Sequence, residues 1–146
     1  MLHLKPITHD NIGDFDGTEY GNMPYEQRHR MIEESINRTH NGMYFEFLVV
    51  YHADTVVGFM NLYAHSAHII SCGSTIKEAF RGRGFGSLAE SMALDYAKQK
   101  GYTVAVGGVN DTNAASIALH EGLGFELDRI YENKQGRSVR LYIKAL

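Results

Sequence analysis

Apolar residues recur along this chain with two different spacings, one typical of strands and one typical of helices. From position 85 the apolar side chains follow i, i+3, i+4 and i+7, and they are Phe85, Leu88, Ala89, Met92, Ala93 and Tyr96. Lys98 and Lys100 close this stretch and Gly101 follows it, and both features are helix-stop signals. The pattern therefore predicts a helix that begins at Phe85 and ends near Lys100.

Runs rich in β-branched and aromatic residues predict seven strands. They cover Leu2–Thr8, Tyr44–Tyr51, Thr55–Ala64, Ala67–Lys77, Tyr102–Val109, Phe125–Glu132 and Ser138–Ala145. Turn residues at Ala53-Asp54 and across Asn133–Gly136 predict hairpins at two of the connections.

Two further helices are predicted from helical spacing and capping residues. One begins at Pro24, which suits a first helical turn, and is expected to end at Asn41-Gly42. The other is capped by Asp111 or Thr112 and runs through Gly122. A short helix carrying Ile12 and Phe15 and a loop over Asp14–Asn22 are expected after the first strand. Strand–helix–strand units around the two late helices require some parallel pairing, which indicates an α/β (α+β) mixed sheet.

Composition narrows the class of protein. The 146 residues suit one domain of ordinary size, and a net charge of −3 gives no reason to expect a nucleic-acid partner. The single cysteine, Cys72, excludes an internal disulfide framework and fits a reducing compartment. No apolar run approaches 18 residues and no leader-like segment opens the chain, so we expect a cytoplasmic protein with no membrane contact.

Three glycines and two arginines fall within Arg81–Ser87, between a predicted strand and the predicted helix at Phe85. Glycine lets a ligand approach the backbone, and a helix N-terminus presents unpaired N–H groups at the positive end of its dipole. Such a turn favours an anion, usually phosphate, although a turn that only leads into the helix is the alternative. Neither the dinucleotide fingerprint G-x-G-x-x-G nor the loop G-x-x-x-x-G-K-[ST] fits any register here.

The loop does match R-x-x-G-x-G, with Arg81, Gly84 and Gly86 at the fixed positions. It resembles the pyrophosphate-binding motif of the GNAT superfamily, the acyl-coenzyme A-dependent N-acyltransferases. Asn113–Phe125 is similar to the other GNAT signature, which runs from an asparagine through an apolar helix to Leu-Gly-Phe. The two motifs stand in the family's order, with one helix and one strand between them, and the resemblance covers about residues 45–145.

The resemblance implies a GNAT-like fold in which residues 1–146 form a single acyltransferase domain, with a mixed, centrally splayed sheet of about seven strands and helices on both faces. It implies acetyl-CoA as co-substrate, no metal, and direct attack by a primary amine of a small molecule or peptide in a ternary complex. The coenzyme site that it implies is Ser74, Thr75, Ile76, Arg81, Gly82, Arg83, Gly84, Phe85, Gly86, Ser87, Asn113 and Ser116. Asn113 would anchor the pantetheine arm, or else act only as a turn or cap residue.

His120 stands where the family usually has the tyrosine that protonates the leaving thiolate. Histidine can supply this proton, and the alternative is that His120 only packs at the edge of the site. The family often uses a strand glutamate or a water chain as the base, and the candidate here is His68, ahead of the glycine loop; a surface or packed histidine is its alternative. Cys72 could act as a nucleophile that becomes acylated. The alternative is that Cys72 only packs in the interior as a small apolar side chain.

The acceptor site is expected between Asp14–Tyr25 and the last hairpin, where Asp14, Asp16, Glu19 and Tyr20 could attract a cation. Acidic loops are usually just solvated, so the sequence does not identify the acceptor amine. The length of the acyl chain and the oligomeric state are also left undetermined, and a homodimer is one possibility. A non-catalytic acyl-CoA-binding sensor or regulatory module is the alternative to an enzyme. A nucleotide-binding Rossmann-like domain is a third interpretation that lacks its fingerprint.

Overall fold

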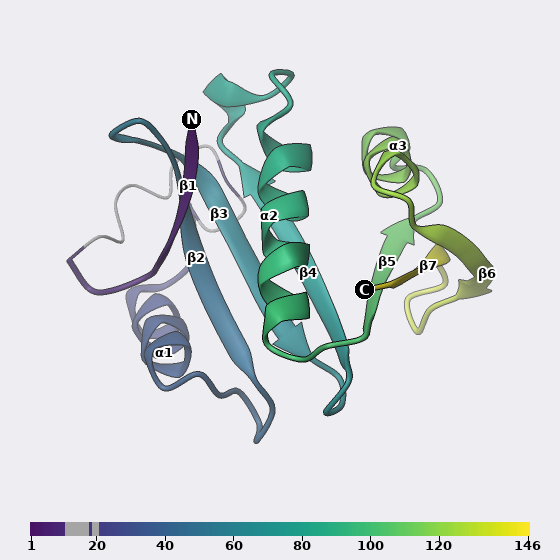
Figure 1. Ribbon diagram of the computed structural model, residues 1–146, viewed down its shortest axis with the longest axis horizontal. Coiled ribbons are helices and arrows are strands. Elements are labelled where there is room, and N and C mark those ends of the chain that lie inside the picture. Colours follow the sequence, from purple (N-terminus) through teal and green to yellow (C-terminus); the bar gives the residue numbers. More distant parts are fainter. Residues whose placement is uncertain (11–17, 19–20) are drawn as a thin grey trace.

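The computed structural model describes residues 1–10, 18 and 21–146, and the strands in this part of the chain form one sheet. Its order is β1-β2-β3-β4-β5-β7-β6 (Figure 1). The strands are β1 (Leu2–Pro6), β2 (Phe45–His52), β3 (Thr55–Ala64), β4 (Ile69–Ile76), β5 (Val104–Asn110), β6 (Glu126–Glu132) and β7 (Ser138–Ala145). The helices are α1 (Tyr25–Ile36), the short 3₁₀ helix η1 (Glu78–Phe80), α2 (Phe85–Gln99) and α3 (Ala114–Gly122).

The sheet is mixed, as predicted. Neighbouring strands pair antiparallel except β4 and β5, which run parallel and are connected through α2. A parallel pair needs a crossover, and the helix that follows the glycine loop supplies it. The predicted α/β (α+β) class, with about seven strands, is confirmed.

Helices cover both faces of the sheet. Alternate residues of β2 face opposite sides, so Leu48 and Val50 pack with the alanines of α2, whereas Phe47 and Val49 pack with Ile32 of α1. Leu94 of α2 and Ile117 of α3 share a third cluster of apolar side chains with β5 and β7. Consequently α2 and α3 lie on one face and α1 on the other.

The parallel pair separates soon after it begins. Only Ile69↔Val104 and Ile70↔Ala105 pair between β4 and β5. At the next position Ser71 Oγ donates a hydrogen bond to the carbonyl of Val106 at 2.8 Å, and beyond it the strands diverge. The central splay that the family resemblance implied is therefore present.

The predicted end of the first helix is wrong. Helix α1 ends at Ile36 rather than at Asn41-Gly42, and Arg38 takes φ 57° soon afterwards. Asn41 (φ 50°) and Gly42 (φ 78°) instead form a tight turn that pairs His40 with Met43, because two successive positive φ values suit a hairpin turn.

The buried stripe of α2 differs from the predicted one, because Leu88 is half exposed. The buried positions are Ala89, Glu90, Ala93, Leu94 and Ala97. The helix therefore turns one acidic residue toward the interior.

The short helix expected at Ile12 and Phe15 lies outside the described residues, as do the acids Asp14, Asp16 and Glu19 and the aromatic Tyr20. Within the described part of the chain, no helix combines the length and apolar character needed to span a membrane.

Candidate active site

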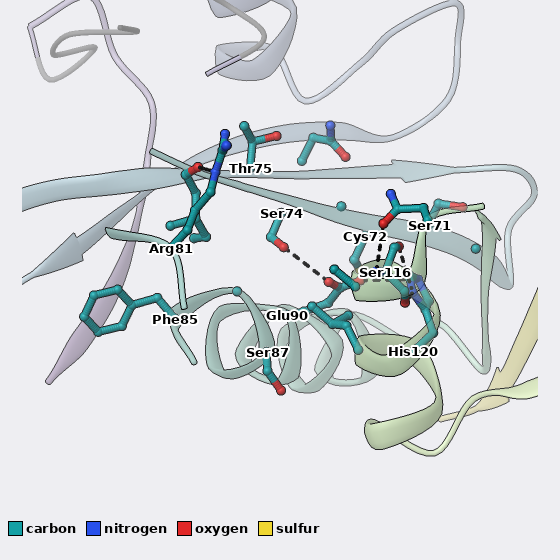
Figure 2. Close-up of a pocket in the computed structure, with 18 of the residues that line it drawn as sticks. Ser71, Cys72, Ser74, Thr75, Arg81, Phe85, Ser87, Glu90, Ser116 and His120 are labelled. Atoms are coloured by element: carbon teal, nitrogen blue, oxygen red, sulfur yellow. Dashed lines mark hydrogen bonds and ion pairs between the residues drawn. The ribbon is translucent and has the colours of Figure 1, made fainter. Parts of the chain in front are cut away.

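A cavity of about 1110 Å³ occupies the space where β4 and β5 diverge. Its wall includes Ser71–Ile76 of β4, Val106–Gly108 of β5, the glycine loop with the start of α2, and one side of α3. Figure 2 shows side chains from β4, α2 and α3 converging on this space. Diverging parallel strands beside a helix N-terminus form the usual ligand crevice of an α/β sheet.

The glycine loop forms one end of the cavity. Gly82 (φ 79°) and Gly84 (φ 80°) both have a left-handed backbone, and a β-carbon on either would meet no atom within 4 Å. Glycine is therefore required by the backbone conformation and not by crowding. Gly84 is the N-cap of α2, and the first intrahelical bond runs from Leu88 N–H to the Gly84 carbonyl. The N–H groups of Phe85, Gly86 and Ser87 precede that bond and have no intrahelical partner, as an anion site needs.

The two arginines of the loop lie differently. Arg81 lines the cavity, and its Nε donates to the Ile76 carbonyl at 2.9 Å, which ties the loop to the end of β4. Arg83 does not line the cavity, and its guanidinium lies 5.7 Å from the centre of the Phe80 ring.

The predicted coenzyme residues on β4 and α3 also line the cavity. Ser74, Thr75 and Ile76 lie on β4 beyond the last pair with β5. Asn113 and Ser116 lie at the start of α3. Thus, of the predicted coenzyme residues, only Arg83 lies away from the cavity.

Asn113 is also the N-cap of α3, because its Oδ1 accepts from Ser116 N–H at 3.1 Å. The prediction that Asp111 or Thr112 caps this helix is wrong. The Asp111 carboxylate instead binds Arg140 at 2.5 Å, and the Thr112 N–H and hydroxyl both donate to Asn110 Oδ1.

His120 is buried on the inner side of α3. Its Nδ1 lies 2.8 Å from the Ser116 carbonyl oxygen, and its ring stacks on Tyr142 and meets Phe125 edge-on. A β-carbon at Gly107 would lie 2.8 Å from His120 Nε2, so β5 needs glycine there to admit the imidazole. His120 therefore lines the cavity from a fixed position.

The structure does not bring His68 to this cavity. His68 is exposed in the bend before β4, at the end of the strand remote from the glycine loop. The predicted strand began at Ala67 and included His68, whereas β4 begins at Ile69 and leaves this residue outside the strand. The His68 carbonyl accepts hydrogen bonds from the N–H groups of Thr103 and Val104, so its backbone holds the start of β5 in place.

Glu90 is the residue of the cavity wall that the sequence patterns missed. It lies one turn into α2, is only 3% exposed, and accepts a hydrogen bond from Ser74 Oγ at 3.4 Å. Its other oxygen lies 3.8 Å from His120 Nε2 (Figure 2). Burial raises the pKa of this carboxyl to about 7, an effect that the Ser74 hydrogen bond partly offsets. The sequence does contain a sign of this burial, because Glu90 stands at helical spacing (i, i+3, i+4, i+7) from Ala93, Leu94 and Ala97.

Cys72 lies on β4 beside this acid. Burial, aided by the charge of Glu90, raises the pKa of the thiol to about 12. A thiol in that state is a poor nucleophile at neutral pH, so its surroundings favour the packing interpretation.

One group of possible metal ligands lies away from the cavity. His9, His29 and Glu33 hold their ligand atoms within 4.8 Å of one another at the surface of α1. His9 Nε2 lies 2.5 Å from a Glu33 oxygen, and this contact lowers the pKa of the carboxyl. The contact already satisfies both groups without a metal ion.

Residues 3–126 match the family described as the acetyltransferase (GNAT) domain. The chain is a GNAT acetyltransferase. GNAT enzymes transfer an acyl group from acyl-coenzyme A to an amine, so the predicted family and reaction class are confirmed.

Among sequence relatives, the L-methionine sulfoximine/L-methionine sulfone acetyltransferase of Salmonella typhimurium is 29% identical over 125 residues. The match covers 86% of this GNAT chain and 67% of that enzyme. The same-named enzyme of Pseudomonas aeruginosa is 33% identical over 70 residues, which are 48% of this chain and 37% of that enzyme.

Solved structures share the fold. A GNAT acetyltransferase from Elizabethkingia anophelis with acetyl-CoA bound superposes with a TM-score of 0.76 at 16% identity, covering 99% of this chain and 98% of that one. The ribosomal-protein-alanine N-acetyltransferase of Brucella melitensis reaches a TM-score of 0.70 at 27% identity, covering 83% and 78%. Nothing in these similarities favours a non-catalytic GNAT module.

Proposed function

We propose that this GNAT domain, residues 1–146, transfers an acetyl group from acetyl-CoA to a primary amine within a ternary complex. The observation that carries the proposal is the separation of β4 from β5 after two paired positions. It leaves strand backbone, a glycine loop and a helix N-terminus along one cavity, which suits a long ligand with an anionic centre. The acetyl-CoA held by the Elizabethkingia anophelis neighbour supports the same ligand here.

The coenzyme pyrophosphate binds the N–H groups of Phe85, Gly86 and Ser87, with the guanidinium of Arg81 beside them. The pantetheine arm lies along Ser74–Ile76 and meets the first turn of α3, where Asn113 and Ser116 stand. The strand N–H groups of this stretch then face the thioester oxygen, where negative charge develops. Arg83, which lies over Phe80, contributes through its charge alone.

The acceptor is an α-amino group. The acceptors of the two relatives above 25% identity with broad coverage are an amino-acid derivative and a protein alanine, and both offer such a group. We also assign the activity to the cytoplasm, since the single cysteine fits a reducing compartment.

His120 protonates the leaving thiolate. When the tetrahedral intermediate collapses, the carbon–sulfur bond breaks and sulfur keeps the electron pair, which a nearby imidazolium can protonate. The buried, fixed position of His120 on the cavity wall supports this role.

The test measures the release of coenzyme A thiol from acetyl-CoA in three separate reactions. One contains L-methionine sulfone, one contains a peptide that begins with alanine, and one contains no amine. We expect release at least about tenfold above the amine-free rate with one of the two amines. Acetyl-CoA binding without any amine-dependent release, over this pair and a wider amine panel, would contradict the enzyme and favour a coenzyme-binding module.

A further inference from the structure

Glu90 is a buried acid on the wall of the cavity. Within the described chain it is the one carboxylate that lines this space, and His120 is the one imidazole. A buried carboxylate costs free energy unless it is well paired, and an apolar side chain would complete the stripe of Ala89, Ala93 and Ala97 at lower cost. Stability alone therefore gives no reason for an acid at this position.

The hydrogen bonds around His120 determine which nitrogen faces Glu90. The Ser116 carbonyl can only accept, so His120 Nδ1 at 2.8 Å carries the hydrogen in both the neutral and the charged imidazole. The neutral ring therefore turns the lone pair of Nε2 toward Glu90 Oε1, 3.8 Å away. One proton is consequently available to the two groups, either on Nε2 or on the carboxyl.

Glu90 has few other partners. Ser74 Oγ donates to its Oε2 at 3.4 Å, a long hydrogen bond that leaves lone pairs on both oxygens facing the cavity. The other titratable group beside it is Cys72 on β4, whose thiol stays protonated at neutral pH because burial raises its pKa. Arg81 is the other charged side chain on the described wall of the cavity, and its Nε is bonded to the Ile76 carbonyl near the glycine loop.

No acid stands on β4 itself, where the family often has its base. We infer that Glu90, carried by α2, takes the proton of the acceptor ammonium and returns it through His120 to the leaving thiolate. This inference rests on the proposed function and adds the base that the sequence patterns left unassigned.

The steps balance. The ammonium gives one proton to the Glu90 carboxylate, and the freed nitrogen lone pair attacks the thioester carbon while the carbonyl π bond becomes an oxyanion. The tetrahedral nitrogen then releases its second proton to water, the oxyanion collapses, and the carbon–sulfur bond breaks. The Glu90 proton moves to the lone pair of His120 Nε2, and the thiolate takes it from that nitrogen. One amide, one thiol and one released proton result.

The test compares Glu90→Gln with Asp95→Asn, which removes an exposed acid from the same helix outside the cavity. With the amine that the wild-type enzyme uses, we expect turnover of Glu90→Gln to fall at least about tenfold, with acetyl-CoA affinity changed less than about threefold. The acid limb of the wild-type pH–rate profile should disappear in Glu90→Gln. Asp95→Asn should keep both the rate and the profile.

A second readout needs no acceptor. Nitrogen NMR of His120 should show hydrogen on Nδ1 in the neutral ring, and the Nε2 signal should change in Glu90→Gln, which removes the carboxylate facing this nitrogen. A wild-type enzyme that turns over, beside a Glu90→Gln variant with unchanged rate, pH profile and His120 Nε2 signal, would overturn this inference alone. A wild type that releases no coenzyme A with any amine would overturn the proposed function instead.

Discussion

Glu46 on β2 and Glu90 on α2 are both buried, and their surroundings differ in kind. One Glu46 oxygen accepts from the hydroxyls of Tyr44 at 2.5 Å and Tyr96 at 2.9 Å, and it lies 3.2 Å from the Arg38 guanidinium. These partners come from α2, from the residue before β2 and from the segment after α1, so the carboxylate holds together elements on the two faces of the sheet.

Glu90 has one long hydrogen bond and an imidazole at 3.8 Å, and it faces a cavity of about 1110 Å³. Burial by itself therefore does not show whether an acid stabilises the fold or transfers a proton. The donors around Glu46 Oε1 tie this carboxylate to neighbouring elements, while its Oε2 is buried without a hydrogen-bond partner. A carboxylate with few donors can change its charge state near neutral pH and so can move a proton.

The largest expected effect on stability comes from removing the well-paired acid. Glu46→Ala leaves two tyrosine hydroxyls and an arginine without their common acceptor, and we expect the free energy of unfolding to fall by about 3 kcal/mol. Urea unfolding measures this loss, with Glu126→Ala on exposed β6 as the control, expected within about 0.5 kcal/mol of wild type. Equal stabilities for the two variants would remove the structural role of Glu46.

A smaller effect is expected from crowding the imidazole that faces Glu90. Gly107→Ala places a methyl group where His120 Nε2 now lies 2.8 Å away, so the ring must move from its present position. We expect turnover to fall by about tenfold, which is about 1.4 kcal/mol on the activation barrier. The matched variant is Gly108→Ala, whose methyl group would meet only ordinary contacts at 3.6 and 3.9 Å. Equal rates in both variants would show that the position of His120 does not matter.

The third expected effect is a pH dependence of stability. Because burial raises the Glu90 pKa from 4.5 to about 7, the folded protein keeps a proton in this window that the unfolded chain has released. The contribution of Glu90 is thus present below pH 4.5 and is lost as the pH rises through about 7, by up to about 1 kcal/mol per pH unit. Urea unfolding of wild type and Glu90→Gln across this range should differ in slope, and parallel curves would contradict the raised pKa.

Much of the fold follows from local patterns. β3 and β7 have the bounds that their runs of β-branched and aromatic residues predict, and α2 begins at Phe85 as its apolar spacing indicates. The end of α1 was mispredicted because Asn41-Gly42 suits a hairpin turn as well as a helix stop, and only the pairing of His40 with Met43 decides between them.

The coenzyme side of the site was predictable and the proton-transfer side was not. A glycine loop before a helix carries its chemistry in consecutive residues, whereas Glu90, Ser74 and His120 meet only through the packing of α2, β4 and α3. His68 does not reach the cavity, because the observed strand begins after this residue, at the end remote from the glycine loop. A single acid within an apolar helix stripe matches no known motif. The sequence therefore does not show which side chains this acid will contact.

The most direct test is calorimetric binding of acetyl-CoA to wild type, Gly84→Asp and Gly42→Asp. Both glycines have a left-handed backbone, φ 80° and 78°, with no atom within 4 Å of a new β-carbon, but only Gly84 lines the cavity. We expect wild type and Gly42→Asp to bind alike and Gly84→Asp to bind at least about 100-fold more weakly, since it places negative charge beside the pyrophosphate. Equal binding by all three proteins, or no binding by wild type, would contradict a coenzyme site between β4 and β5.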